Sequence, residues 1–256
     1  MQYFKMLIIL CICFFSGEPV KGEPSIFLYY FERSPYSVTD SDGGVRGLVA
    51  TPAVNAFERA GIPFQWKKMP FKRQLVVIKL DKKRACGIGW LKNPERASFA
   101  RFTDVVYQDR PTVIVSKNGN KALELHRDLK SLIKDKEIRL LVKNGFSYGA
   151  YIDALINRLN PPIVSVVTSN NLQMLQMIRS DRADYLFMSE EEAKHIILSA
   201  GYELSQFRLL HFDDMPESNR RYIACSRQVS PKILHRLNRA LKDRDLDASR
   251  NGFERN

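Results

Sequence analysis

The chain is predicted to adopt an α/β fold, because strand and helix signals alternate along it. Short apolar runs recur, and the apolar residues between them repeat at helical spacing. The 256 residues suffice for two modest domains, and the alternation falls into two successive blocks. Such alternation is typical of parallel α/β units. We therefore expect two units of this kind.

The first block contains three predicted strands, at residues 26–30, 63–67 and 85–90. Two predicted helices separate them, with apolar faces formed by Ala53, Ala56, Phe57 and Ala60, and by Phe71, Leu75 and Ile78. Gly61 ends the first of these helices, since glycine readily adopts the left-handed conformation found after helix ends. We assign both apolar faces to a core.

The second block follows the apolar run 112–116 and a polar turn at 117–120. Its predicted strands lie at residues 138–142, 163–167 and 185–188. Its three predicted helices carry the apolar faces Ile152, Leu155, Ile156 and Leu159; Leu172, Leu175 and Ile178; and Ala193, Ile196, Ile197 and Ala200. The chain returns to strand character at 221–225 and ends in a helix that Ser230 caps.

Residues 1–22 have the pattern of an export signal. Lys5 precedes an apolar run at 6–15, and the small residue Gly22 fits a cleavage site. We expect the mature chain to start near Glu23; the alternative is an uncleaved anchor. Export leaves only Cys86 and Cys225, and their spacing does not decide between one disulfide and two buried thiols.

The net charge of +12 invites a nucleic-acid interpretation, which we reject. The basic residues are scattered, and export removes the usual nucleic-acid partners. The four histidines show no nucleophile or metal-ligand spacing, and no phosphate-binding or dinucleotide-binding glycine motif occurs. We therefore expect no nucleic-acid partner, no cofactor, no metal and no catalytic residues.

Two segments carry candidate binding residues. In residues 85–107 a buried strand runs into a Gly89-Trp90 turn and then a polar loop with Arg96. An arginine just past a parallel strand points into the crevice where open α/β sheets bind ligands. Residues 143–149 form a glycine-bordered turn before a helix, whose free N–H groups would bind an anion. Alternatively, that turn is an ordinary strand-to-helix connection.

These segments, in their order, resemble the family 3 extracellular solute-binding proteins, the periplasmic receptors of polar amino acid transporters. The resemblance rests on Ser34-Pro35-Tyr36, Gly89 through Arg96, Phe102-Thr103-Asp104 with Tyr107, residues 143–149, and Arg182-Ala183-Asp184. It implies that Arg96 binds a ligand carboxylate. It also implies that Ser147 and Tyr148 face the ligand, and that aromatic residues among Tyr30, Tyr36, Phe71 and Trp90 wall the site.

Two positions depart from the family pattern. Arg33 stands where an aromatic residue is expected to stack on the ligand. Ser189 stands where an acid is expected to hold the ligand's amino group, with Glu190 beside it. A buried ammonium needs a carboxylate or several acceptors. Either Glu190 substitutes for the missing acid, or the ligand is another small carboxylate-bearing molecule.

The resemblance implies a two-lobed type II periplasmic binding protein fold with two crossover hinge strands. We assign residues 1–22 to the signal peptide, 23–112 to the first part of lobe 1, 113–220 to hinge strands and lobe 2, and 221–256 to the return segment of lobe 1. In that fold the returning strand lies beside the strand that holds Cys86. The resemblance therefore implies a disulfide between Cys86 and Cys225.

The function implied is that of a monomeric, non-enzymatic periplasmic receptor. It would capture a small polar solute and pass it to an ABC-type permease or a membrane sensor. The alternatives are a dehydratase-like enzyme on the same fold, with Glu190 as its acid or base, and an orphan ligand-sensing protein.

Overall fold

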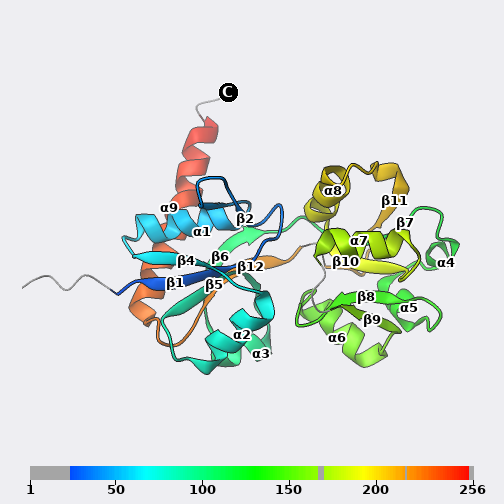
Figure 1. Ribbon diagram of the computed structural model, residues 1–256, viewed down its shortest axis with the longest axis horizontal. Helices are drawn as coiled ribbons and strands as arrows, with labels where there is room; N and C mark the ends of the chain where they lie inside the picture. The colour runs from blue at the N-terminus through cyan, green and yellow to red at the C-terminus, as the bar shows by residue number, and fades with distance from the viewer. Residues whose placement is uncertain (1–23, 167–169, 217, 254–256) are drawn as a thin grey trace, which may run out of the picture.

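The computed structural model describes residues 24–166, 170–216 and 218–253. The chain forms two α/β lobes, each with helices on both faces of a five-stranded sheet (Figure 1). The predicted export signal lies outside the described residues. Within the described part, no helix is both long and apolar enough to cross a membrane.

Lobe 1 is built on the sheet β4-β1-β5-β12-β6. Its strands are β1 (Ile26–Tyr30), β4 (Phe64–Lys68), β5 (Ala85–Leu91), β6 (Arg101–Gln108) and β12 (Arg220–Cys225). Helices α1 (Ala50–Arg59) and α9 (Pro231–Phe253) cover one face, and α2 (Phe71–Leu80) and α3 (Pro94–Phe99) the other (Figure 1). A small hairpin, β2 (Val38–Thr39) and β3 (Val45–Arg46), precedes α1.

Lobe 2 is built on the sheet β11-β7-β10-β8-β9. Its strands are β7 (Thr112–Lys117), β8 (Leu140–Lys143), β9 (Ile163–Val166), β10 (Tyr185–Ser189) and β11 (Phe207–Leu210). Helices α7 (Asn171–Arg179) and α8 (Glu190–Ser199) lie on one face. The other face carries α4 (Lys121–Glu124), α5 (Leu129–Lys134) and α6 (Ala150–Leu159), and a 3-10 turn, η1 (Leu204–Gln206), precedes β11.

The chain passes between the lobes twice. It leaves lobe 1 between β6 and β7 and returns between β11 and β12. The strands next to these passages pair antiparallel: β12 with β5 and β6, and β7 with β10 and β11. The expected parallel pairing holds for β1 with β4 and β5, and for β8 with β9 and β10. The passages bring the inner edges of both sheets to one cleft.

The predicted strands and helices are confirmed to within a few residues at their ends, with one correction at the most important segment. Arg96 was expected in a polar loop, but it lies in the helix α3. The Asn93 side chain caps this helix by accepting from the Arg96 N–H at 2.8 Å, and Pro94 occupies its first turn. Both are favourable helix-start residues. The elements β6, β11, α4, α5 and the hairpin of β2 and β3 were not predicted from the sequence.

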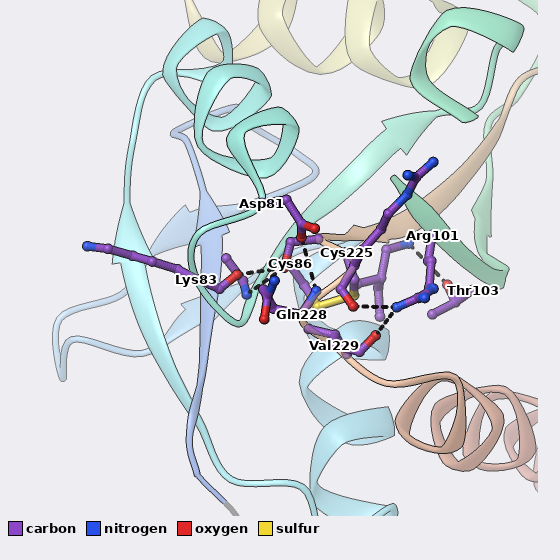
Figure 2. The surroundings of a disulfide bond; sticks show 12 residues. Asp81, Lys83, Cys86, Arg101, Thr103, Cys225, Gln228 and Val229 are labelled. Carbon is purple, nitrogen blue, oxygen red and sulfur yellow. Dashed lines mark hydrogen bonds between the residues drawn. A yellow bond between two sulfur atoms is a disulfide. The ribbon is translucent and has the colours of Figure 1, made fainter. Parts of the chain in front are cut away.

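A disulfide joins Cys86 of β5 to Cys225 of β12, with their Cα atoms 4.0 Å apart (Figure 2). The two residues are direct partners in the antiparallel ladder, and both are fully buried. The bond that the family resemblance implied is therefore present. It ties the returning strand, 139 residues further along the chain, to the first part of lobe 1.

Candidate functional site

A small cavity of about 50 Å³ lies between the lobes. Seven of the residues singled out from the sequence line it: Arg33, Phe71, Gly89, Arg96, Ser147, Tyr148 and Ser189. They come from both lobes and are far apart in the chain. The structure thus brings together the two candidate segments, Arg33 and the position at the end of β10.

Arg96 is the central cation of this cavity, and its side chain is almost fully buried. Its Nη1 donates to the carbonyl of Leu91 at 2.9 Å, and its Nη2 to the carbonyl of Gly145 in lobe 2 at 3.4 Å. Among the described residues, no carboxylate forms an ion pair with Arg96. Burial lowers the pKa of Arg96, with Asp153 and Glu95 opposing this shift. A buried cation without an anion is costly, so the position favours a negatively charged ligand.

Aromatic rings close the cavity from both lobes. Phe31 and Phe71 of lobe 1 contact Phe146 of lobe 2, with ring centroids 5.7 and 5.1 Å apart. The guanidinium of Arg96 lies 5.2 Å from the Phe71 ring centroid. Trp90, expected in the wall, is instead fully buried behind Phe71, and its indole N–H donates to Gln74 at 3.3 Å. The inward face of β5 directs it into the core.

The turn at 143–149 differs from the expected anion cradle. The N–H groups at the helix start were expected to be free, but that of Tyr148 donates to the Asp153 carboxylate at 2.8 Å. The Ser147 hydroxyl also donates to Asp153. An acid in the first turn of α6 thus takes the donors that a ligand would use, as acids at helix starts commonly do. The Tyr148 hydroxyl accepts from the Lys143 N–H at 2.9 Å, so it holds the turn together.

Arg33 connects the lobes through a two-pronged ion pair. Its Nε and Nη2 donate to the two carboxylate oxygens of Glu192 in α8, at 2.6 and 2.8 Å. Glu192 is fully buried and also accepts from the Asn171 side chain at 2.6 Å. Burial disfavours the charge on Arg33, but Glu192 more than offsets this, and the pKa of Arg33 is raised. Beside this pair, Ser34 Oγ and His195 Nε2 are 2.6 Å apart.

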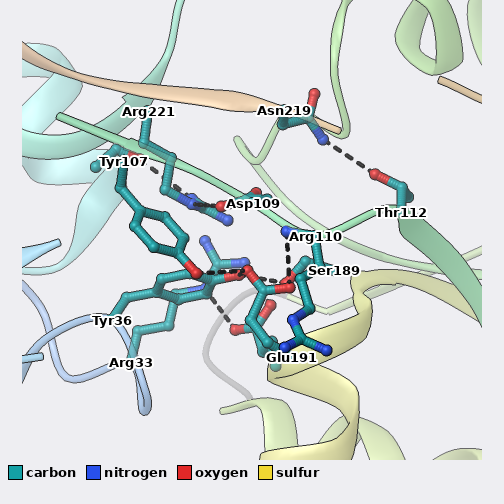
Figure 3. A network of polar contacts seen from close by, with 12 residues as sticks. Arg33, Tyr36, Tyr107, Asp109, Arg110, Thr112, Ser189, Glu191, Asn219 and Arg221 are labelled. Atoms are coloured by element: carbon teal, nitrogen blue, oxygen red, sulfur yellow. Dashed lines mark hydrogen bonds and ion pairs between the residues drawn. The ribbon is translucent and has the colours of Figure 1, made fainter. Parts of the chain in front are cut away.

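A second set of contacts crosses the cleft at the start of α8 (Figure 3). Glu191 Oε1 accepts from the hydroxyls of Tyr36 and Tyr107 at 3.2 and 3.3 Å. Its other oxygen accepts from the Arg110 N–H at 3.1 Å. Tyr36, which was expected to wall the ligand, hydrogen-bonds with Ser189 across the lobes and is not among the cavity-lining residues. Burial raises the pKa of Tyr36, so its hydroxyl remains a hydrogen-bond donor.

A buried ion pair within lobe 1 forms the back of the cavity. Arg221 Nε donates to Asp109 Oδ1 at 2.6 Å, and both side chains are at most 5% exposed. The Arg221 guanidinium lies 4.0 Å from the Tyr36 ring centroid and donates to the Gly89 carbonyl at 3.3 Å. Burial raises the pKa of Asp109 to about 6, and Arg221 opposes this rise.

Glu190 does not take the place of the missing acid. Its carboxylate pairs with Lys194 one turn further along α8, and it does not line the cavity. Ser189, at the end of β10, lines the cavity but is held by Tyr36. The acid assigned to the dehydratase-like alternative therefore lies outside this cavity. Among the described residues, no three histidine, cysteine or acidic side chains are grouped to hold a metal ion.

Several site residues were not foreseen from the sequence: Phe31, Asp109, Thr112, Phe146, Asn219 and Arg221, with Glu192 behind Arg33. Arg221 follows another arginine, and only strand alternation could have shown that one of the two faces inward. Glu192 belongs to a run of three acids at a helix start. Such a run reads as helix-dipole stabilisation, although its third member is the buried one.

This geometry, two α/β lobes closing on a cleft, defines a type II periplasmic binding protein fold. The family model for bacterial extracellular solute-binding proteins, family 3, matches residues 29–251. The chain therefore belongs to that family. A comparison with curated proteins by sequence found no match.

Solved structures with the same fold include an ancestral arginine-binding protein bound to arginine, at 18% identity and a TM-score of 0.69; 89% of this chain and 95% of that chain are covered. The arginine-, lysine-, histidine-binding protein ArtJ of Geobacillus stearothermophilus has 12% identity and a TM-score of 0.68; the match covers 88% of this chain and 91% of that chain. An ancestral amino acid-binding protein, described as a precursor of cyclohexadienyl dehydratase, has 16% identity and a TM-score of 0.66; the match covers 89% of this chain and 92% of that chain. At these identities the likeness is one of fold.

Proposed function

We propose that this protein is a periplasmic receptor that captures a small carboxylate-bearing solute between its lobes. The observation that carries the proposal is Arg96, a buried cation at the cavity that has no carboxylate partner among the described residues. A ligand carboxylate would neutralise the Arg96 guanidinium through two parallel charge-assisted hydrogen bonds. Aromatic rings from both lobes would exclude water around this contact.

Membership of the family supports a place for the protein in solute uptake. Residues 1–22 would direct the chain to the periplasm and be removed there. The receptor would act as a monomer, without catalysis, and pass its solute to an ABC-type permease or a membrane sensor. The lobes would part to admit the solute and close on it, the usual motion of two lobes joined by short connections.

The test pairs carboxylates with their uncharged amides. Thermal unfolding of the purified protein is followed with small carboxylic acids and with the matched primary amides, for example lactate against lactamide. We expect carboxylates alone to raise the midpoint, and Arg96→Ala to remove the rise. Arg220→Ala, which removes an exposed arginine from the neighbouring strand, is the matched control and should keep it.

Two outcomes would contradict the proposal. One is an equal response to acids and amides, because Arg96 would then recognise no charge. The other is an unchanged response in Arg96→Ala, which would place the solute elsewhere.

A further inference from the structure

The charges around the cavity are unbalanced toward the positive. Among the described residues that line it are three arginines, Arg33, Arg96 and Arg221, and a single acid, Asp109. An amino acid ligand brings an ammonium group as well as a carboxylate. In a closed cleft that ammonium needs an anion to replace its water.

Each acid near the cavity is already engaged by the chain itself. Asp109 is held by Arg221 at 2.6 Å, and Glu192 receives both prongs of Arg33. Glu191 accepts from two tyrosine hydroxyls and a backbone N–H. Asp153, beside Arg96, accepts from the Ser147 hydroxyl and the Tyr148 N–H. Among the described residues, each acid at the cavity thus already has a partner from the chain, which a ligand's ammonium would have to share or replace.

Arg33 occupies the position between the lobes that a cationic ligand group would need. Its guanidinium is 2.6 Å from the fully buried Glu192 and stacks on rings from both lobes, 5.0 Å from Tyr36 and 5.4 Å from Phe146. The Arg221 guanidinium lies on the same tyrosine ring, 4.0 Å from its centroid. An ammonium brought here would meet two guanidiniums, and like charges at such distances repel.

The remaining polar groups of the cavity are neutral. Asn219 and Thr112 line it and hydrogen-bond to each other at 3.2 Å. An amide and a hydroxyl can donate to or accept from a keto or hydroxyl oxygen. These groups suit an uncharged oxygen substituent better than an ammonium.

We infer that the solute is a small carboxylic acid without an amino group, of the 2-oxo or 2-hydroxy acid class, and that Arg33 excludes α-amino acids by holding Glu192. This inference rests on the proposed function and narrows its solute. The solute's carboxylate binds Arg96. The Arg33 guanidinium takes the place beside Glu192 of lobe 2 that the ammonium of an amino acid would otherwise occupy.

The first test compares matched acids on the wild-type protein by calorimetric titration. The acids of each set differ only in the group on the second carbon, which is oxo, hydroxy or amino. The sets are pyruvate, L-lactate and L-alanine; 2-oxoglutarate and L-glutamate; and phenylpyruvate and L-phenylalanine. We expect the oxo or hydroxy member of at least one set to bind about tenfold or more tightly than its amino counterpart. Equal or tighter binding of the amino member overturns the inference while leaving the proposed function in place.

The second test moves the specificity. Arg33→Met keeps much of the side-chain stem but frees Glu192, so the amino-to-oxo affinity ratio should rise about tenfold or more. Arg33→Lys retains the cation and should keep the wild-type preference. Arg33→Met combined with Glu192→Gln removes the freed carboxylate and should lose the gain.

The outcomes separate the two claims. An unchanged ratio in a folded Arg33→Met protein contradicts the role of Arg33. If that variant does not fold, the wild-type comparison still decides the solute class. Arg33→Gln, which also removes the cation that holds Glu192, then carries the same prediction for the amino-to-oxo affinity ratio. A wild-type protein that binds no carboxylate in either test contradicts the proposed function, and the inference falls with it.

Discussion

The two faces of the cleft differ in charge. The lobe 1 face presents three arginines, whereas the lobe 2 face presents Glu191 and Glu192 at the start of α8. Part of the attraction that closes the lobes therefore comes from the chain itself. In a receptor that depends on its ligand for closure, the ligand would bridge the faces. Here Arg33 and Glu191 already do so (Figure 3).

The two buried arginine pairs show the same contrast on a smaller scale. Arg221 and Asp109 both lie on the lobe 1 side of the cleft, so we expect them to stay together when the lobes part. Arg33 and Glu192 belong to different lobes, so opening must separate them and return both to water. We therefore expect the first pair to be structural and the second to influence the balance between open and closed forms.

The largest expected effect is a loss of stability in lobe 1 that lobe 2 does not share. Replacing Cys86 and Cys225 together by serine removes the disulfide of lobe 1, which in a chain-entropy description stabilises by about 5 kcal/mol for a loop of this length. Both tryptophans of the chain, Trp66 and Trp90, lie in lobe 1. Their fluorescence transition in urea should move to much lower concentration than in the wild-type protein.

Far-UV circular dichroism supplies the control, because lobe 2 contributes to that signal and contains no tryptophan. We expect a lobe 2 transition that stays near the wild-type midpoint. A fluorescence midpoint that does not change would show that the disulfide contributes nothing to lobe 1.

The next effect acts on closure. Glu192→Gln leaves Arg33 without its carboxylate and should shift the balance toward the open form by about 3 kcal/mol. Small-angle X-ray scattering should show a larger radius of gyration than for the wild-type protein. Asp181→Asn removes the acid of an exposed ion pair with Lys117 and is the matched control, expected to change little. Identical scattering from all three proteins would mean that Arg33 and Glu192 do not hold the lobes.

The smallest effect concerns pH and the pair within lobe 1. Burial raises the pKa of Asp109 to about 6, above its value in the unfolded chain, so the folded state takes up this proton more readily. The contribution of the Asp109 proton to the free energy of unfolding is complete below about pH 4 and is lost as the pH rises through about 6. Asp109→Asn should remove up to about 3 kcal/mol of pH dependence in this window. A slope identical to that of the wild-type protein would contradict the raised pKa.

The sequence was informative where periodicity or a motif constrained it. Apolar spacing located α1, α2 and α8, and the Asn93-Pro94-Glu95-Arg96 segment located the cavity's central cation. The sequence was uninformative where the site depends on which of several neighbouring residues of the same type faces inward. Nothing local distinguishes Arg221 from Arg220, or Glu192 from Glu191 and Glu190. The contacts of Arg33 depend on closure of the lobes, across 159 residues of chain. The assignment of residues 23–112, 113–220 and 221–256 to lobes stays a prediction.

The central claim is that Arg96 holds the carboxylate of a small solute. Native mass spectrometry of freshly purified wild-type protein and of Arg96→Ala, prepared side by side, tests it most directly. We expect a bound small acid, released on denaturation, that is present on the wild-type protein and absent from the variant. The same bound molecule on both proteins would contradict it.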